Sequence, residues 1–226
     1  MENIKLSESV QNYLKVIYKL ETEKGEATTS DIAYELNISS ASVTGMLKRL
    51  ASMQLVNYSS YKGVSLTDDG LKIALEVLRH HRLLEAYLRG SMGYKLARLH
   101  DEACKLEHYV SDEFIEKVTN MLGDPDFSPL GHPIPRKDGE IPLQDNISLI
   151  DLKPVVSGVI SSIDTRNNEL INYLDQIGLI PGKKITLHEI APFYGPIVIN
   201  LEGKNISIGY EVAKILKIDK STIEYS

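Results

Sequence analysis

Four side chains able to bind a metal ion follow one another at helical spacing: His100, Cys104, Glu107 and His108. Because an α-helix turns by about 100° per residue, these positions fall within roughly a third of one helical face. Earlier in the chain, His81 and Glu85 lie one helical turn apart and share a face. Imidazole, thiolate and carboxylate groups together form a donor set for a divalent transition metal, and they are rarely buried without a partner. The spacing therefore predicts a site for Fe(II), Zn(II), Ni(II), Co(II) or Mn(II).

Two other interpretations of these residues have to be weighed. Taken singly, a helical histidine is most often a surface residue, and a lone cysteine such as Cys104 is most often a small buried hydrophobe. A cysteine and a histidine could also form a nucleophilic pair. Cys104 and His108 lie one turn apart on one predicted helix, however, and no Gly-rich loop at a helix start offers an oxyanion hole. We therefore favour metal binding and expect no enzyme activity.

The composition is that of a globular protein of one or two domains. The chain has 226 residues, 42% hydrophobic and 25% charged, with a formal net charge of −6. It contains no run of about 18 apolar residues and no apolar signal-peptide segment, so we expect neither a membrane span nor secretion. Its single cysteine cannot form an internal disulfide, which fits a reducing cytoplasm.

The N-terminal part of the sequence predicts a winged helix-turn-helix. Apolar residues at helical spacing alternate with turn signals, and two β-prone runs follow. The expected elements, in order, are helix 7–21, helix 30–36, a third helix capped by Ser39 or Ser40, and strands 55–58 and 64–67 around a turn at 61–63.

This predicted helix-turn-helix lies in an acid-free window. Between Glu35 and Asp68 there is no acidic residue and there are three cations, a local charge of +3 in a chain of net charge −6. Short hydroxyl side chains at a helix start suit phosphates, base edges and thymine methyl groups. A purely structural α+β module is the alternative, but these features favour DNA binding, with some readout of DNA shape. The candidate DNA contacts are Ser39, Ala41, Ser42, Thr44, Gly45, Lys48, Arg49 and Lys62.

The rest of the chain changes character twice. Helix is expected over 68–90 and again, as one or two helices, over 94–122. Six of the nine prolines then lie between residues 125 and 154, which disfavours helix and predicts a linker. Short β-prone runs return as a small β-barrel-like domain, with strands expected at 155–163, 184–190, 197–201 and 206–208 and one helix at 168–177.

Four motifs make the chain resemble a known family: the Arg82-containing segment 80–85, His-Asp-Glu-Ala-Cys-x-x-Glu-His at 100–108, Ser-Asp-Glu at 111–113 and Ser-Pro-x-Gly-x-Pro-Ile-Pro at 128–135. They are similar to motifs of the iron- and manganese-dependent repressors typified by the diphtheria toxin repressor. The resemblance covers nearly the whole chain and implies a mainly α fold with a small β part. The implied domains are a winged helix-turn-helix at 1–70, a helical metal-binding and dimerisation domain at 71–124, a proline-rich linker at 125–153 and an SH3-like β-barrel, similar to a ferrous-transport accessory domain, at 154–226.

The same resemblance implies two metal sites. The primary regulatory site would use Asn12, Cys104, Glu107 and His108, and the ancillary site would use His81, Glu85 and His100 with Glu169 of the third domain. In the family, the first-helix ligand is a methionine in the iron-responsive branch and an aspartate in the manganese branch. Asn12 departs from both, whereas Cys104 follows the iron branch.

The function implied is that of a cytoplasmic, homodimeric, metal-activated repressor that binds a palindromic double-stranded operator and controls metal homeostasis, with no membrane partner. Fe(II) is the expected metal, a Mn(II)-responsive repressor is the runner-up, and Co(II), Ni(II) and Zn(II) are expected to bind in vitro. A metal-buffering protein that never binds DNA is a different interpretation, which the acid-free window disfavours. A winged-helix regulator without a metal would leave the donors between residues 81 and 108 unexplained.

Overall fold

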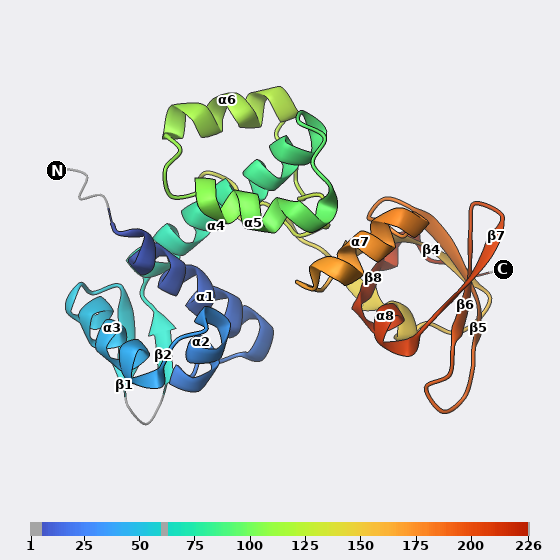
Figure 1. Cartoon of the computed structure of the whole chain (residues 1–226), viewed down its shortest axis with the longest axis horizontal. Helices are drawn as coiled ribbons and strands as arrows, with labels where there is room; N and C mark the ends of the chain where they lie inside the picture. The colour runs from blue at the N-terminus through green and yellow to red at the C-terminus, as the bar shows by residue number, and fades with distance from the viewer. Residues whose placement is uncertain (1–5, 60–62, 226) are drawn as a thin grey trace. The chain divides into compact units, whose positions relative to one another are not determined.

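The computed structural model describes residues 6–59 and 63–225 (Figure 1). The chain divides into two compact units. The first unit contains residues up to 81 together with 105–110 and 135–140, and the second contains 82–104, 111–134 and the chain from 141 onward. None of the described helices is both long and apolar enough to cross a membrane.

The first unit has the predicted winged helix-turn-helix order. Its elements are α1 (Glu8–Lys24), α2 (Thr29–Leu36), α3 (Ser40–Ser52), β1 (Val56–Ser59), β2 (Gly63–Leu66) and the first part of α4 (Asp68–Gly90). The side chains of Ser7, Thr28 and Ser39 cap the first three helices. Strands β1 and β2 pair antiparallel, as predicted, but the predicted turn residues Tyr61 and Lys62 lie outside the described residues.

One apolar core holds these elements together. Leu14 and Ile17 of α1 are fully buried, as are Ile32 of α2 and Leu47 and Leu50 of α3. Burying such a side chain stabilises a fold by about 1.5–3 kcal/mol, so this face of α1 fixes the helix in the first unit. The remaining faces of α1 are then available to polar side chains.

The second unit combines helices with an antiparallel sheet. Its elements are the rest of α4, most of α5 (Leu96–Leu106), α6 (Asp112–Leu122), β3 (Asn146–Ser148), η1 (Leu149–Asp151), β4 (Val156–Ile163), α7 (Asn168–Ile177), β5 (Lys184–Ile190), β6 (Ile197–Leu201), β7 (Lys204–Ile208), α8 (Tyr210–Ile215), β8 (Leu216–Asp219), η2 (Lys220–Thr222) and β9 (Glu224–Tyr225). The seven-stranded sheet has the order β3-β8-β4-β5-β6-β7, with β9 paired to β4. Its core side chains include Ile160, Leu187 and Ile218.

The predicted elements of this unit are confirmed with two corrections. Helices α4 and α7 and strands β5 and β6 have the bounds expected from the sequence. Helix α8 and strands β3, β8 and β9 were not predicted. The prediction of one helix carrying all four donors from His100 to His108 is wrong, because α5 ends at Leu106. The carbonyl of Leu106 accepts hydrogen bonds from the N–H groups of Tyr109 and Val110, so Glu107 and His108 lie in a turn.

The proline-rich segment 125–154 contains no α-helix, as predicted, but its middle part packs closely on the sheet. The N–H of Ile163 at the end of β4 donates to the carbonyl of Leu130 over 3.0 Å, and Leu130 and Ile134 are buried. Gly131 adopts φ +83°, and a Cβ there would lie 1.8 Å from the carbonyl oxygen of Ser161. The segment therefore approaches β4 at a position that accepts only glycine.

Gly131→Ala is expected to destabilise the second unit by about 2–4 kcal/mol, because the new methyl group would displace the backbone from β4. Gly203 is a matched control: it has φ +84°, and nothing among the described residues lies within 4 Å of an added Cβ. Gly203→Ala should cost only the strain of a left-handed alanine, about 1–2 kcal/mol. Urea denaturation followed by circular dichroism would give the free energy of unfolding of both variants. Equal losses of this free energy would contradict the close approach of Gly131 to β4.

Candidate functional site

Helix α1 presents a polar stripe in addition to its buried face. Glu8, Gln11 and Lys15 recur at intervals of three and four residues, which aligns them along the helix, and Asn12 lies beside them. Gln11, Asn12 and Lys15 are half-buried. These four residues, defined here as the α1 polar stripe, supply side chains to the site from the DNA-binding unit.

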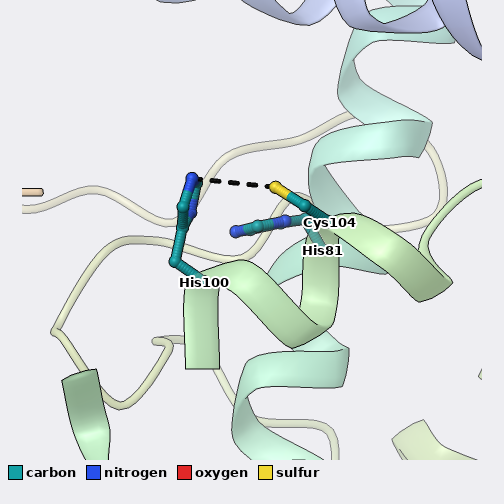
Figure 2. A group of neighbouring side chains, drawn as sticks. All are labelled: His81, His100 and Cys104. Atoms are coloured by element: carbon teal, nitrogen blue, oxygen red, sulfur yellow. Dashed lines mark hydrogen bonds between the residues drawn. The ribbon is translucent and has the colours of Figure 1, made fainter. Parts of the chain in front are cut away.

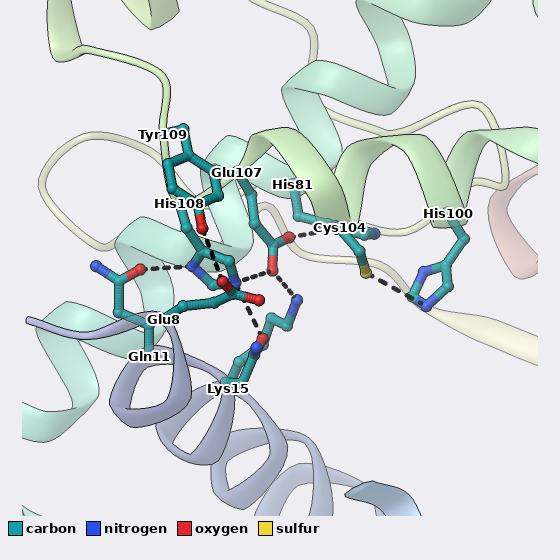
Figure 3. A network of polar contacts seen from close by, with 10 residues as sticks. Glu8, Gln11, Lys15, His81, His100, Cys104, Glu107, His108 and Tyr109 are labelled. Carbon is teal, nitrogen blue, oxygen red and sulfur yellow. Dashed lines mark hydrogen bonds and ion pairs between the residues drawn. The ribbon is translucent and has the colours of Figure 1, made fainter.

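Three consecutive residues after α5 contact this stripe (Figure 3). The pairs are Glu107 with Lys15, His108 with both Gln11 and Asn12, and Tyr109 with Glu8. Residues 105–110 belong to the same compact unit as α1. The turn thus lies along α1, and each of its polar side chains has a partner there.

Glu107 is the most buried carboxylate of this cluster, with a side chain that is 0% exposed. Its Oε1 contacts Nζ of Lys15 and lies 3.1 Å from Nε2 of His108, while its Oε2 lies 2.5 Å from Nδ1 of His81. Burial alone would raise the pKa of this carboxyl. Hydrogen bonds from His108 and His81, with the charges of His81 and Lys15, instead hold the pKa of Glu107 well below its ordinary range. Glu107 is therefore a buried anion that is stable only next to positive charge.

The His108 ring is oriented so that one nitrogen faces two oxygens. Nδ1 lies 2.5 Å from Oε1 of Gln11, an amide oxygen that accepts the ring N–H. Nε2 lies 3.1 Å from Oδ1 of Asn12 and 3.1 Å from Oε1 of Glu107. Both oxygens are acceptors, so a proton or a metal ion has to be shared among the three atoms. Ligand atoms bonded to one transition metal at about 2.0–2.2 Å lie roughly 3 Å apart, which matches the two distances measured from Nε2 of His108.

The remaining predicted ligands belong to the second unit, except His81. Cys104 and His100 lie one turn apart on α5, with Sγ 3.7 Å from Nε2 (Figure 2). His81, another imidazole among the predicted ligands, lies on α4 in the first unit. Glu85 of α4 is buried. The resemblance implied Glu169 as a further ligand; it is exposed at the start of α7.

The start of α7 lies close to α5 within the second unit. Nδ2 of Asn168, the residue before Glu169, donates to the carboxylate of Asp101 over 3.3 Å, and Asp101 follows His100. Arg89 near the end of α4 forms an ion pair with Asp175 of α7, with an N–O distance of 3.0 Å. Two polar contacts therefore join α7 to the helices that carry the second-unit donors.

Gln11 and Lys15 are site residues that the sequence did not suggest. Gln11 holds the His108 ring, and Lys15 neutralises Glu107. The only sequence signal was the 8–11–15 polar stripe opposite an apolar one, a pattern that by itself is typical of any surface helix.

The candidate DNA contacts follow the exposed side of α3. Ala41, Gly45 and Lys48 recur at helical spacing, and nothing among the described residues lies within 4 Å of an added Cβ at Gly45. Thr44 is half-buried, and its hydroxyl donates to the carbonyl of Ser40 over 3.0 Å. The exposed candidates are Ser39, Ala41, Ser42, Gly45, Lys48 and Arg49, whereas Lys62 lies outside the described residues. α3 therefore presents small and cationic residues, which would let a DNA duplex approach closely.

The sequence matches three domain models. They describe an iron dependent repressor N-terminal DNA binding domain at residues 5–64, an iron dependent repressor metal binding and dimerisation domain at 67–136, and a FeoA domain at 147–220. The chain is 30% identical to the diphtheria toxin repressor of Corynebacterium glutamicum over 224 residues, covering 95% of this chain and 97% of that protein. The chain belongs to the iron-dependent repressor family.

Other members of the iron-dependent repressor family agree in fold and length. The iron-dependent repressor IdeR of Mycobacterium tuberculosis is 28% identical, covering 95% of this chain and 98% of the relative. A manganese-dependent transcriptional repressor in complex with manganese superimposes with a TM-score of 0.84 at 29% identity, covering 93% of this chain and 99% of that one. The fold predicted from the sequence is confirmed, and the protein is a metal-dependent, DNA-binding transcriptional repressor with a dimerisation domain.

Proposed function

We propose that Fe(II) activates this repressor by binding a regulatory site made of Asn12, Cys104, Glu107 and His108. The observation that carries the proposal is that Oδ1 of Asn12 and Oε1 of Glu107 each lie 3.1 Å from Nε2 of His108. A bound divalent ion would accept a lone pair from each of these three atoms. We further propose an ancillary site that draws on His81, Glu85, His100 and Glu169.

The chain's own residues would convert metal binding into DNA binding. Asn12 lies on α1, whose buried face packs in the DNA-binding core, while Glu107 and His108 lie on the turn after α5. A metal ion bound to Asn12 and to the turn favours the arrangement in which α1 and the turn remain in contact. Binding linkage then requires that operator DNA tighten metal binding by the same factor.

The metal preference would depend on Cys104. A thiolate favours softer ions, whereas Mn(II) prefers oxygen donors. We expect Cys104→Asp to shift the ratio of Mn(II) to Fe(II) dissociation constants toward Mn(II) by about tenfold or more, roughly 1.4 kcal/mol. Operator-binding titrations with Mn(II), and with Fe(II) under anaerobic conditions, would measure it, with Cys104→Ser as the control of similar size. An unchanged ratio in Cys104→Asp would remove Cys104 from the ligand set.

Metal-dependent operator binding is the test of the function as a whole. Selection of duplexes from a random pool, with and without Fe(II), should yield a palindromic sequence only with metal, since a two-fold dimer reads two half-sites. We also propose a cytoplasmic location, because a lone thiol ligand stays reduced there. Tight metal binding without any selected duplex would instead favour a metal-buffering protein.

A further inference from the structure

Lys15 occupies a position in the cluster that differs from that of an ordinary surface lysine. Its side chain is 16% exposed, and its Nζ contacts Oε1 of Glu107, whose side chain is 0% exposed. That same oxygen lies 3.1 Å from Nε2 of His108. The ammonium group therefore binds the oxygen that would coordinate a metal together with His108.

The next turn of α1 provides a contrast. Lys19 lies four residues after Lys15 and pairs with both carboxylate oxygens of Glu35 on α2, each over 2.9 Å. This ion pair joins α1 to α2, and Glu35 is not among the proposed metal ligands. Lys15 and Lys19 are thus equivalent in residue type and helix but not in partner.

Two cations close to one carboxylate oxygen repel each other. Inside a protein this repulsion is screened far less than in water, because the effective dielectric constant is lower. A divalent ion that coordinates Oε1 of Glu107 must therefore break the Lys15 ion pair or bind against the charge of the ammonium group. Either way, the free energy of the Lys15–Glu107 pair opposes metal binding.

We propose that Lys15 sets the metal affinity of the regulatory site by competing with the metal for Glu107. This inference rests on the proposed function. Lys15 also keeps the buried carboxylate neutralised, and joined to α1, when no metal competes for it. Metal binding is then an exchange of one cation for another, and the metal concentration needed for activation is higher than the ligands alone would require.

The test compares Mn(II) affinity in four full-length proteins: wild type, Lys15→Met, Lys15→Arg and Lys19→Met. Free Mn(II) would be counted by electron paramagnetic resonance at increasing total Mn(II). Lys15→Met keeps an unbranched side chain, one atom shorter, and removes the charge, so its dissociation constant should fall about tenfold or more, roughly 1.4 kcal/mol. Lys15→Arg keeps the charge and should remain within about threefold of wild type, as should Lys19→Met.

Thermal melts provide a second readout. Without metal, Lys15→Met should melt below wild type, because Glu107 loses a counter-charge. Saturating Mn(II) should raise its melting temperature by more than it raises that of wild type, since a tighter ligand stabilises more at equal concentration. If Lys15→Met does not fold, Lys15→Gln makes the same comparison with a polar side chain.

The outcomes separate the two proposals. Suppose that wild type binds Mn(II) and Lys15→Met binds it equally or more weakly. The role of Lys15 is then overturned, and the proposed metal site stands. An equal gain in Mn(II) affinity in Lys19→Met and Lys15→Met also overturns the role of Lys15, because any loss of positive charge from α1 would then raise the affinity. If wild type binds no Mn(II), the same comparison is made with Fe(II) under anaerobic conditions, and wild type that binds neither ion overturns both proposals.

Discussion

Glu107→Gln is expected to weaken Mn(II) and Fe(II) binding by more than about a hundredfold, since loss of an outer-shell partner alone costs about 10- to 100-fold. The amide keeps the shape of the side chain but removes the anion that lies against Nε2 of His108. Operator binding should then no longer respond to metal. Metal titrations by competition with a chelator, together with operator binding, would measure both effects.

Loss of folding has to be separated from loss of metal binding in this variant. Removing one partner of a buried ion pair costs roughly 3–5 kcal/mol, so Glu107→Gln should also be less stable. Lys15→Met added to Glu107→Gln removes the uncompensated ammonium and should restore much of the stability. It should not restore metal binding. Metal affinity that recovers along with stability would mean that Glu107 is structural.

The double substitution Lys48→Ala and Arg49→Ala is expected to weaken binding to DNA of any sequence, the operator included. Both residues are exposed on α3, inside the acid-free window. Each phosphate contact contributes about −0.9 to the slope of log affinity against log salt, so loss of four cations from a dimer should reduce the slope by up to about 3.6. Binding isotherms at several salt concentrations would give the slope.

A second adjacent pair of cations provides the charge-matched control. Lys184 is the first residue of β5 and Lys183 precedes it, and each pairs with a carboxylate, Lys183 with Glu202 and Lys184 with Glu224. Lys183→Ala with Lys184→Ala changes the net charge equally but should leave the salt slope unchanged. If both double variants lose the same slope, overall charge rather than the α3 surface determines DNA affinity.

Local signals made some elements predictable from the sequence. Helix α7 begins at Asn168 after the capping side chain of Asn167 and ends at Ile177, followed by Gly178 in the left-handed conformation. Strand β8 lacks such signals: Leu216 and Ile218 alternate over only four residues, and their partners β3 and β4 precede them by more than fifty residues. Strand pairing between residues so far apart in the chain cannot be predicted from a short window of sequence.

The candidate site was predictable in residue type but not in geometry. Donor chemistry and the family resemblance suggested Glu107 and His108, whereas the end of α5 at Leu106 carries no glycine or proline to mark it. Gln11 contacts His108 across 97 positions of the chain. A side chain whose role depends on so distant a partner cannot be recognised from its neighbours.

The two faces of α1 have a consequence for how such sensors diversify. Leu14 and Ile17 maintain the DNA-binding core, while Gln11, Asn12 and Lys15 of the same helix contact Glu107 and His108. If the proposed site regulates the protein, substitutions on the polar face would change the metal threshold while the core that holds α3 stays intact. An organism moving to a habitat richer or poorer in a metal could adapt its regulator through these three positions, and a directed-evolution library limited to them would sample the same range.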